Sequence, residues 1–375
     1  MQAVAYGTVD MRLHWNDISS DPYLAELRTR AGDDALLGRV VAQDGPILEV
    51  VSPHGIAYAR PSGRLAFRIE LRSAPVPAVG DYVEIDPDQT TIVRDVLPRR
   101  SVFERGEAGR RTAAQVVCTN IDRAVIVTTA PPATAREESD RTALNDFSVR
   151  RIERFVATLD SRVEAVVVLN KSDLIAGTER VSESVRAQLP GIEVCMVSAR
   201  SGAGVEQVRR LIPPGSTAVL VGSSGSGKST LIGRLTGHTL RTSSIRETDG
   251  RGRHTTTGRR TYALERGGLL IDTPGMREVQ LWTAAGGDDR LGAAFAEIDE
   301  LASECRFSDC RHLDEPDCAV RAAVRDGRIT DDRYLSYLEL HNEQRDAEAR
   351  REKQDRLTER RVARASRKRR RSRGG

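Results

Sequence analysis

The chain has 375 residues, of which 39% are hydrophobic and 30% are charged. That length exceeds one ordinary hydrophobic core and predicts two or three globular domains. The N-terminus has no basic start followed by an apolar core, and no apolar stretch approaches the ~20 residues of a membrane helix. Neither a secretory signal nor a membrane partner is therefore expected. Five cysteines are an odd number, which argues against a disulfide framework and favours a reducing cytoplasm.

The formal net charge of +4 depends on the C-terminus. Residues 361–373 carry eight basic side chains and no acidic one, so residues 351–375 are predicted to form a basic tail. A block of like charge is usually a solvated, disordered segment. Its other interpretation is an arm that binds nucleic-acid phosphates, because each neutralised phosphate releases counterions. The sequence leaves both interpretations open.

The first predicted elements are short strands. Residues 1–37 have weak periodicity and form an unassigned N-terminal extension, whereas residues 38–98 alternate β-rich runs with turn signals. Five or six strands in this span predict a small barrel of the SH3 or OB type. One predicted strand, RLAFRIELR at 64–72, offers either an oligonucleotide-binding face or ordinary strand residues at Arg64, Phe67, Arg68 and Arg72. Residues 99–115 are predicted to be a basic linker.

A parallel α/β sheet is predicted next. Apolar β-branched runs alternate with helical patterns in the order strand 122–130, helix 149–159, strand 163–170, helix 181–189, strand 192–199, helix 204–212 and strand 217–222. Such alternation with short crossovers is typical of an α/β domain with a parallel sheet. The segment 131–146 is polar and is expected to be a loop.

The stretch GSSGSGKST fits the phosphate-binding pattern G-x-x-x-x-G-K-[ST] between a predicted strand and a predicted helix. Its glycines let backbone N–H groups close around phosphate oxygens at a helix N-terminus. Lys228 is expected to reach the β- and γ-phosphates, and the Ser229 hydroxyl to bind Mg²⁺. The motif predicts a nucleotide, without saying which, bound by Gly222, Ser223, Ser224, Gly225, Ser226, Gly227, Lys228, Ser229 and Thr230.

Two further stretches are typical of GTPase switches. The tetrad DTPG closes another apolar run, where Asp272 is expected to hold Mg²⁺ through water and the Gly275 N–H to sense the γ-phosphate. Between this tetrad and the phosphate loop, GRGRHTTTG offers Thr255 and Thr256 as alternative Mg²⁺ ligands in a switch loop. His254 could orient water, touch a partner or be a solvated loop histidine.

A guanine-reading motif, Asn-Lys-Ser-Asp, follows the predicted strand 163–170. The Asp173 carboxylate can accept hydrogen bonds from guanine N1–H and from the 2-amino group, both of which adenine lacks. Asn170 would brace the loops, the Lys171 stem would lie along the base, and the Ala199 N–H could meet guanine O6. The predicted guanine site comprises Asn170, Lys171, Ser172, Asp173, Ser198 and Ala199. Because this motif precedes the phosphate loop, the sequence predicts a GTPase whose motif order is permuted.

That order resembles the circularly permuted GTPases, and within them the bacterial RsgA family of ribosome small-subunit-dependent GTPases. The resemblance runs from Gly38 to Asp332 and rests on TNIDRAVIV, VVLNKSDL, SGSGKSTLI, GRHTTT, LIDTPGMRE and CRFSDCRHLDEPDCAV. It implies a multi-domain fold with an N-terminal OB barrel, a circularly permuted α/β GTPase domain at 116–283, and a mainly helical zinc-binding domain at 284–350. The N-terminal extension, the loop 131–146 and the basic tail depart from the family pattern.

The same resemblance implies late maturation of the 30S ribosomal subunit, with GTP, GDP, the 30S subunit and its rRNA as partners. Hydrolysis of GTP would be stimulated by that subunit. We expect the protein to be a cytoplasmic monomer. Other hypotheses are a different permuted ribosome-assembly GTPase, a non-catalytic RNA-binding scaffold that holds GTP, and a P-loop kinase or ATPase. The last conflicts with Asn170 and Asp173 unless those residues are a coincidence.

A cysteine–histidine cluster lies near the C-terminus, with the spacing C-x₄-C-x-H-x₅-C. Three thiolates and one imidazole can close a tetrahedral structural zinc site, although three free thiols near a helix fit the spacing too. The resembled family has this ligand pattern and implies one structural Zn²⁺ on Cys305, Cys310, His312 and Cys318.

The hydrolytic machinery is predicted to be incomplete. Ras-like enzymes place a water-orienting glutamine after D-x-x-G, whereas this chain has Met276. We therefore expect slow intrinsic hydrolysis that a partner accelerates, since groups supplied by a partner contribute about 10³–10⁵-fold in known GTPases. The residues assigned to catalysis are Lys228, Asp272, Gly275 and His254, and the group that activates water stays open.

Overall fold

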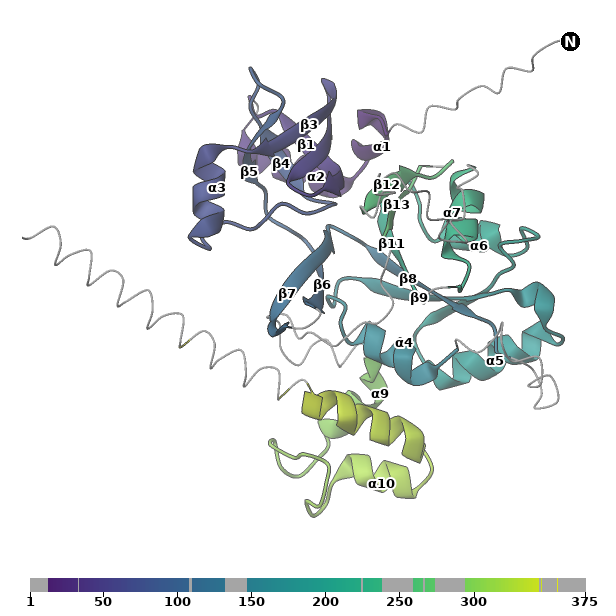
Figure 1. The fold of residues 1–375 in the computed structure, drawn as a ribbon. Coiled ribbons are helices and arrows are strands. Elements are labelled where there is room, and N and C mark those ends of the chain that lie inside the picture. The colour runs from purple at the N-terminus through teal and green to yellow at the C-terminus, as the bar shows by residue number, and fades with distance from the viewer. Residues whose placement is uncertain are drawn as a thin grey trace, which may run out of the picture. The chain divides into compact units, whose positions relative to one another are not determined.

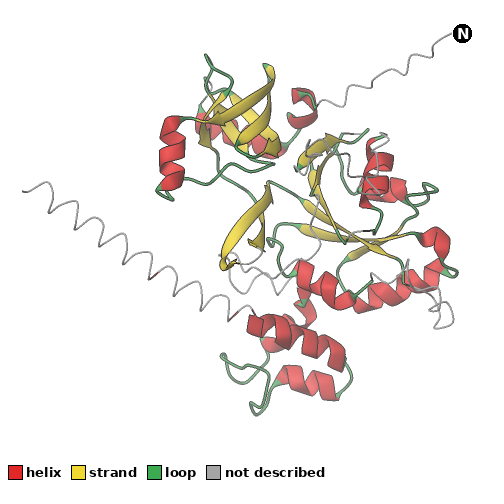
Figure 2. Ribbon diagram, viewed as in Figure 1, coloured by secondary structure: helices red, strands yellow, loops and turns green. Residues whose placement is uncertain are grey.

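A computed structural model describes residues 13–32, 34–107, 110–131, 147–223, 225–237, 259–265, 267–273, 294–343, 345 and 356 (Figures 1 and 2). The chain divides into two compact units, each assembled from segments distant in sequence. The first unit takes in Met1–Val102, Val117–Phe147 and Arg162–Glu278, and the second takes in Phe103–Val116, Ser148–Ser161 and Val279–Gly375. No described helix is both long enough and apolar enough to cross a bilayer.

Part of the N-terminal extension is helical. The helices are α1 (Trp15–Ile18) and α2 (Pro22–Ala31). Asp21 caps α2, because its carboxylate accepts a hydrogen bond from the Tyr23 N–H, and proline occupies the first helical position. Leu24 and Leu27 are buried in a cluster with barrel residues, so these helices belong to the core of the first unit.

The predicted OB barrel is confirmed. Its strands are β1 (Leu37–Asp44), β2 (Ile47–Ser52), β3 (Gly55–Pro61), β4 (Tyr82–Ile85) and β5 (Ile92–Val96). They pair in the order β1-β2-β3-β5-β4, and an additional β1–β4 pairing closes the barrel. β3 and β5 run parallel and the other pairs run antiparallel.

The predicted strand at 64–72 is wrong, because this segment contains the helix α3 (Gly63–Glu70). The Ser62 hydroxyl caps α3 by accepting a hydrogen bond from the Leu65 N–H. Leu65 and Ile69, four residues apart, pack on the barrel core, whereas Phe67 between them is exposed. Alternating apolar residues suggested a strand, but the helical period decides which of them are buried. Arg64, Phe67, Arg68 and Arg72 therefore do not share a strand face.

The described part of the predicted linker contains two strands. Strands β6 (Val102–Glu107) and β7 (Arg110–Thr119) form a two-stranded sheet, and β7 continues past the end of the predicted linker at residue 115. Phe103 is fully buried in the second unit, where its ring lies 5.4 Å from that of Phe155. In the first unit, Arg99 pairs with Asp81 at 2.7 Å. Arg99 is therefore a structural anchor as well as a charge.

The α/β sheet places the predicted motifs along one edge. Its strands are β8 (Arg123–Thr129), β9 (Glu164–Asn170), β10 (Glu193–Met196), β11 (Thr217–Val221), β12 (Arg260–Ala263) and β13 (Leu269–Asp272). They pair in the order β10-β9-β8-β11-β13-β12, and all pairs are parallel except β12–β13. Parallel strands end at the same edge, so the residues that follow β9, β11 and β13 come together there.

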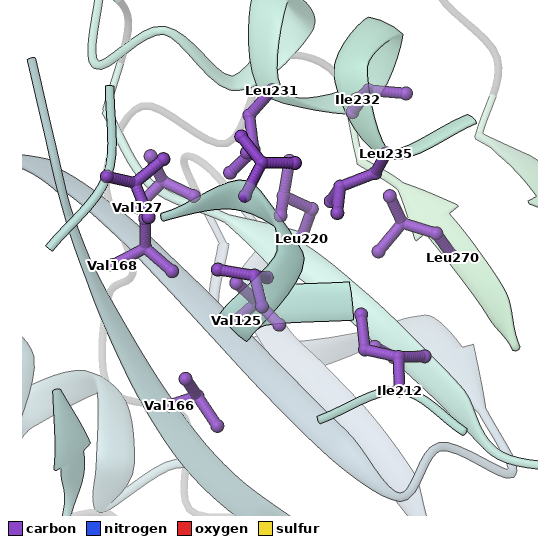
Figure 3. Close-up of a cluster of buried hydrophobic side chains, with 14 of the residues drawn as sticks. Val125, Val127, Val166, Val168, Ile212, Leu220, Leu231, Ile232, Leu235 and Leu270 are labelled. Atoms are coloured by element: carbon purple, nitrogen blue, oxygen red, sulfur yellow. The ribbon is translucent and has the colours of Figure 1, made fainter. Parts of the chain in front are cut away.

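Helices pack against this sheet through branched aliphatic side chains. The helices of this domain in the first unit are α5 (Thr178–Gln188), α6 (Val205–Arg210) and α7 (Lys228–Thr236). In the core drawn in Figure 3, Leu231, Ile232 and Leu235 of α7 face buried strand residues such as Val125 and Leu220. Strands buried on both faces read as nearly continuous apolar runs, which explains why the sequence revealed them.

The second unit contains the helices α4 (Val149–Val156), α9 (Ala296–Ala302), α10 (Ala319–Arg325) and a helix over residues 331–343. A buried ion pair joins α4 to the last helix: Glu153 accepts hydrogen bonds from Arg333 and, at 2.5 Å, from the Ser336 hydroxyl. Arg333 also lies 4.3 Å from the centre of the Phe295 ring. The helix between β8 and β9 in sequence therefore packs with C-terminal helices.

Candidate functional site

The phosphate loop links the end of β11 to the start of α7. The Lys228 ammonium folds back over the loop and donates to the carbonyl oxygens of Gly222 at 2.7 Å and Ser223 at 2.5 Å. Ser226 is buried, and its hydroxyl donates to the Ser223 carbonyl at 3.0 Å. The predicted Ser229 and Thr230 are exposed in the first turn of α7. Ser224 lies outside the described residues.

Asn170 joins three sequence motifs. Its Nδ2 donates to the Ser226 carbonyl of the phosphate loop at 2.7 Å, and its Oδ1 accepts from the Ala199 N–H at 2.9 Å. The side chain is buried, with 2% of its surface exposed. Both ends of one amide are therefore used, so the positions of the phosphate loop and the loop at 197–202 depend on each other.

The Asp173 carboxylate is oriented by a serine. The Ser198 hydroxyl donates to Asp173 Oδ1 at 2.6 Å and accepts from the Ser201 N–H at 3.1 Å. Ser198 is buried, whereas Asp173 is exposed in a 3-10 turn at Ser172–Leu174. Lys171 precedes this turn with a φ of +62°, in the left-handed region. The arrangement orients the carboxylate through Oδ1 and leaves Asp173 with further acceptor capacity at an exposed position.

One detail of the predicted guanine site differs in the structure. The Ala199 N–H, expected to meet guanine O6, donates to Asn170 Oδ1. Among the described residues, the next backbone donor, the Arg200 N–H, has no hydrogen-bond partner. The sequence does not show this hydrogen bond, because the backbone partner of each N–H is decided by tertiary contacts.

Asp272 lies beside the phosphate loop, because it pairs in register with Leu220 near the end of β11. Burial raises the pKa of the Asp272 carboxyl above its ordinary value, and the charge of Lys228 opposes that shift. The next residue, Thr273, is buried and donates its hydroxyl to the Leu220 carbonyl at 3.0 Å. The other predicted switch residues, His254, Thr255, Thr256, Gly275 and Met276, lie outside the described residues.

One arginine that the sequence did not single out contacts the same loops. Arg234 of α7 donates to the carbonyl oxygens of Ala199 and Arg200, at 3.1 and 2.6 Å. A side chain that binds backbone carbonyls leaves no sequence motif, so only its place six residues after Lys228 could have suggested this role.

The predicted metal ligands come together in the second unit. The ligand atoms of Cys305, Cys310, His312 and Cys318 lie within 4.8 Å of one another and could hold a metal ion. His312 Nδ1 is 3.6 Å from Cys305 Sγ and 3.5 Å from Cys318 Sγ, and these two sulfurs are 3.9 Å apart. Burial lowers the pKa of His312, which favours the neutral imidazole that metal binding requires.

Comparison with known proteins agrees with this architecture. The family model of the RsgA GTPase matches residues 96–282. The chain is 39% identical over 345 residues to the small ribosomal subunit biogenesis GTPase RsgA of Opitutus terrae, covering 88% of this chain and 89% of that protein. It is 38% identical over 338 residues to the protein of that name from Streptomyces coelicolor, covering 88% and 85%.

Two solved structures share the fold. The crystal structure of YjeQ from Thermotoga maritima superposes with a TM-score of 0.58 at 24% identity, covering 83% of this chain and 98% of that one. The crystal structure of YloQ, described as a circularly permuted GTPase, gives 0.55 at 23% identity and covers 83% and 96%. The fold is therefore shared with a solved structure that is described as circularly permuted.

Proposed function

The chain belongs to the RsgA GTPase family, and from this membership we propose that it hydrolyses GTP to GDP and phosphate during biogenesis of the small ribosomal subunit. The observation that carries the proposal for this chain is the Asn170 side chain. It connects the phosphate loop to the loop at 197–202 and lies three residues before Asp173. A guanine ring and its phosphates could thus be bound by elements that are already held together.

In this proposal, Asp173 accepts hydrogen bonds from the guanine N1–H and 2-amino groups, while the Lys171 stem covers one face of the base. Adenine would leave the carboxylate without these donors, which is the usual source of strong discrimination. The Lys228 ammonium exchanges its two loop carbonyls for phosphate oxygens when a nucleotide binds. Further contacts would come from Ser172, Ser198, Ala199 and the phosphate loop from Gly222 to Thr230.

Mg²⁺ would be held with the nucleotide by Ser229, by Asp272 through water, and by Thr255 or Thr256. The ion would neutralise the charge that develops on the phosphates during hydrolysis. Gly275 and His254 complete the proposed catalytic set. Because Met276 cannot orient water, we expect the ribosomal subunit to complete or order this site.

We propose one structural Zn²⁺ on Cys305, Cys310, His312 and Cys318. Tetrahedral ligands at the usual Zn–S and Zn–N lengths are ~3.8 Å apart for two sulfurs and ~3.6 Å apart for sulfur and nitrogen. The observed separations of 3.9, 3.6 and 3.5 Å fit that geometry. Four protein ligands leave no open position, so the ion would stabilise the helical domain and take no part in hydrolysis.

The proposed partners are GTP, GDP, the 30S subunit and its rRNA, and the proposed state is a cytoplasmic monomer. The test is GTP turnover measured with 30S subunits, with 50S subunits and without ribosomal particles, with ATP as a competitor. We expect slow hydrolysis alone, acceleration by 30S subunits only, and no competition by ATP.

Full turnover without subunits would overturn the proposed activation, and competition by ATP would overturn the guanine assignment. A single-turnover measurement that finds no phosphate released with 30S subunits would instead favour the scaffold hypothesis. Repeating the assay without residues 351–375 tests whether the basic tail contributes to subunit binding.

A further inference from the structure

Arg234, on the helix that follows the phosphate loop, holds the loop at 197–202 in place. Arg234 is exposed on α7, and its guanidinium reaches the carbonyl oxygens of two successive residues: Nε lies 3.1 Å from that of Ala199, and Nη2 lies 2.6 Å from that of Arg200. Hydrogen bonds from a charged donor are shorter and stronger than those between neutral groups. Two such bonds fix two neighbouring peptide planes.

Each fixed peptide plane carries an N–H on its opposite side, because the described chain has no cis peptide bond. The plane that contains the Ala199 carbonyl also contains the Arg200 N–H, which has no hydrogen-bond partner among the described residues. Arg234 therefore holds an unused backbone donor so that it points away from α7. Such a donor suits an acceptor like guanine O6.

The second plane connects to the acidic residue. The plane that contains the Arg200 carbonyl also contains the Ser201 N–H, which donates to Ser198 Oγ at 3.1 Å. The Ser198 hydroxyl in turn donates to Asp173 Oδ1 at 2.6 Å. A continuous series of hydrogen bonds therefore runs from Arg234 to the carboxylate.

The position of Arg234 is itself restrained. Arg209 of the neighbouring helix α6 donates to the Arg234 carbonyl at 2.9 Å and pairs with Glu206 at 2.5 Å. Six residues before Arg234, α7 begins at Lys228, so the same short helix carries the phosphate-binding lysine and the arginine that holds the other loop.

We propose that Arg234 is a positioning residue that sets guanine selectivity, by orienting the Arg200 N–H toward O6 and the Asp173 carboxylate toward the N1–H and 2-amino groups. This inference rests on the proposed function, because it assumes that the cleft binds guanine nucleotides. It adds a determinant of base choice that lies on the phosphate-loop helix.

The test compares GDP with purine riboside diphosphate, which has the ribose and phosphates but lacks both O6 and the 2-amino group. Dissociation constants are measured for the full-length chain and for Arg234→Met, which keeps the apolar stem and removes the charge. We expect Arg234→Met to bind GDP about tenfold more weakly and purine riboside diphosphate almost unchanged. Arg234→Lys, which can keep one of the two bonds, should fall between.

Arg210→Met is the matched control, since it removes the same charge from an exposed position on α6. It should leave the ratio of the two dissociation constants unchanged. A merely structural role of Arg234 would lower the unfolding temperature of the nucleotide-free protein and leave that ratio unaltered. An unaltered ratio in Arg234→Met therefore overturns the inference. If the unmodified chain itself shows no preference for GDP, the proposed function fails first.

Discussion

Asn170 Nδ2 lies 2.7 Å from the Ser226 carbonyl oxygen, and this contact leaves no room for a side chain at Gly227. A Cβ built on Gly227 would lie 2.2 Å from the same Nδ2 atom. Gly227 also has a φ of +92°, in the region that favours glycine. The glycine before Lys228 is thus needed for two reasons: backbone conformation and the approach of the guanine-motif asparagine.

A first prediction separates these two reasons. Gly227→Ala should lower the unfolding temperature of the nucleotide-free protein more than Gly225→Ala does. Gly225 has a similar φ of +85°, but nothing lies within 4 Å of its Cβ position. The conformational strain, about 1–2 kcal/mol, is shared by both variants, so the difference measures the collision with Asn170. Equal losses would show that the asparagine yields easily.

Removal of the asparagine should also be costly by itself. Asn170→Ala leaves the buried Ser226 carbonyl and the Ala199 N–H without their partner, at about 1–3 kcal/mol for each unsatisfied group. We expect GDP affinity to fall by at least about tenfold in calorimetric titration. Adding Gly227→Ala to this variant should cost less than it does in the unmodified chain, because the colliding amide is gone. Strict additivity would contradict the geometry.

A second prediction concerns Asp272 and pH. Burial raises the pKa of its carboxyl, so the native state binds that proton more tightly than the unfolded chain does. The native state is therefore increasingly disfavoured as pH rises from the ordinary aspartate value of 3.8, and the penalty is complete above the raised pKa.

Asp272→Asn removes this penalty. The nucleotide-free variant should unfold at a higher temperature than the unmodified protein at pH 7, and the advantage should vanish below about pH 3.8, where both states carry the proton. GTP hydrolysis should fall by about 10–100-fold, as for loss of a residue that holds a metal through water. A variant that is less stable at pH 7 would disprove the assigned direction of the pKa.

A third prediction concerns the metal cluster. The purified chain should contain one zinc ion, and Cys310→Ser should lose it. Asp309→Asn, which changes the exposed neighbouring residue, should retain the ion. Metal content is measured after acid release, and thermal unfolding of the second unit is followed in parallel. Retention of stoichiometric zinc by Cys310→Ser would contradict the assignment of four ligands.

A fourth prediction concerns the ion pair between α4 and the helix at 331–343. Glu153 is 2% exposed, and its removal takes away one of the two carboxylates that pair with the buried Arg333, leaving only the partly exposed Glu297 at 2.7 Å. Leaving a buried charge without any partner costs about 3–5 kcal/mol, and because Arg333 keeps Glu297, Glu153→Ala should destabilise the second unit by up to about 3 kcal/mol.

Its control is Arg150→Ala, which removes an exposed pair with Asp332 that contributes at most about 1 kcal/mol. Hydrogen exchange of α4 and of residues 331–343 would locate the effect. Comparable protection in both variants would show that the buried pair does not hold these helices together.

Several features could be read from the chain because their physical causes are local. Runs of branched apolar residues formed the buried parallel strands as predicted, since both faces of such strands must be apolar. The glycines and lysine of the phosphate loop occupy neighbouring positions in sequence, so the motif and its strand–loop–helix context were recognisable. The cysteine spacing likewise put four possible ligands within one short segment.

Other expectations depended on distant contacts. The alternating run at 64–72 was compatible with both a strand and a helix. Within this run, Leu65 and Ile69 pack against the barrel core, at the spacing of a helix. Part of the predicted linker forms strands, and its Phe103 ring packs against that of Phe155, which lies about fifty residues away in sequence. Neither outcome is encoded in local periodicity, because the deciding partners lie far away in sequence.

The sequence alone determined the chemistry available to the proposed nucleotide site: a phosphate-loop pattern, an Asn-Lys-Ser-Asp motif and their unusual order along the chain. Only the tertiary structure decided how these parts are coupled. In the folded chain the Ala199 N–H donates to the Asn170 side chain, and the amide of that side chain lies against Gly227. Arg234 donates to carbonyl oxygens of the loop at 197–202. The physical reason is that motifs record which side chains are present, whereas the partner of each backbone donor and acceptor depends on how strands and helices pack.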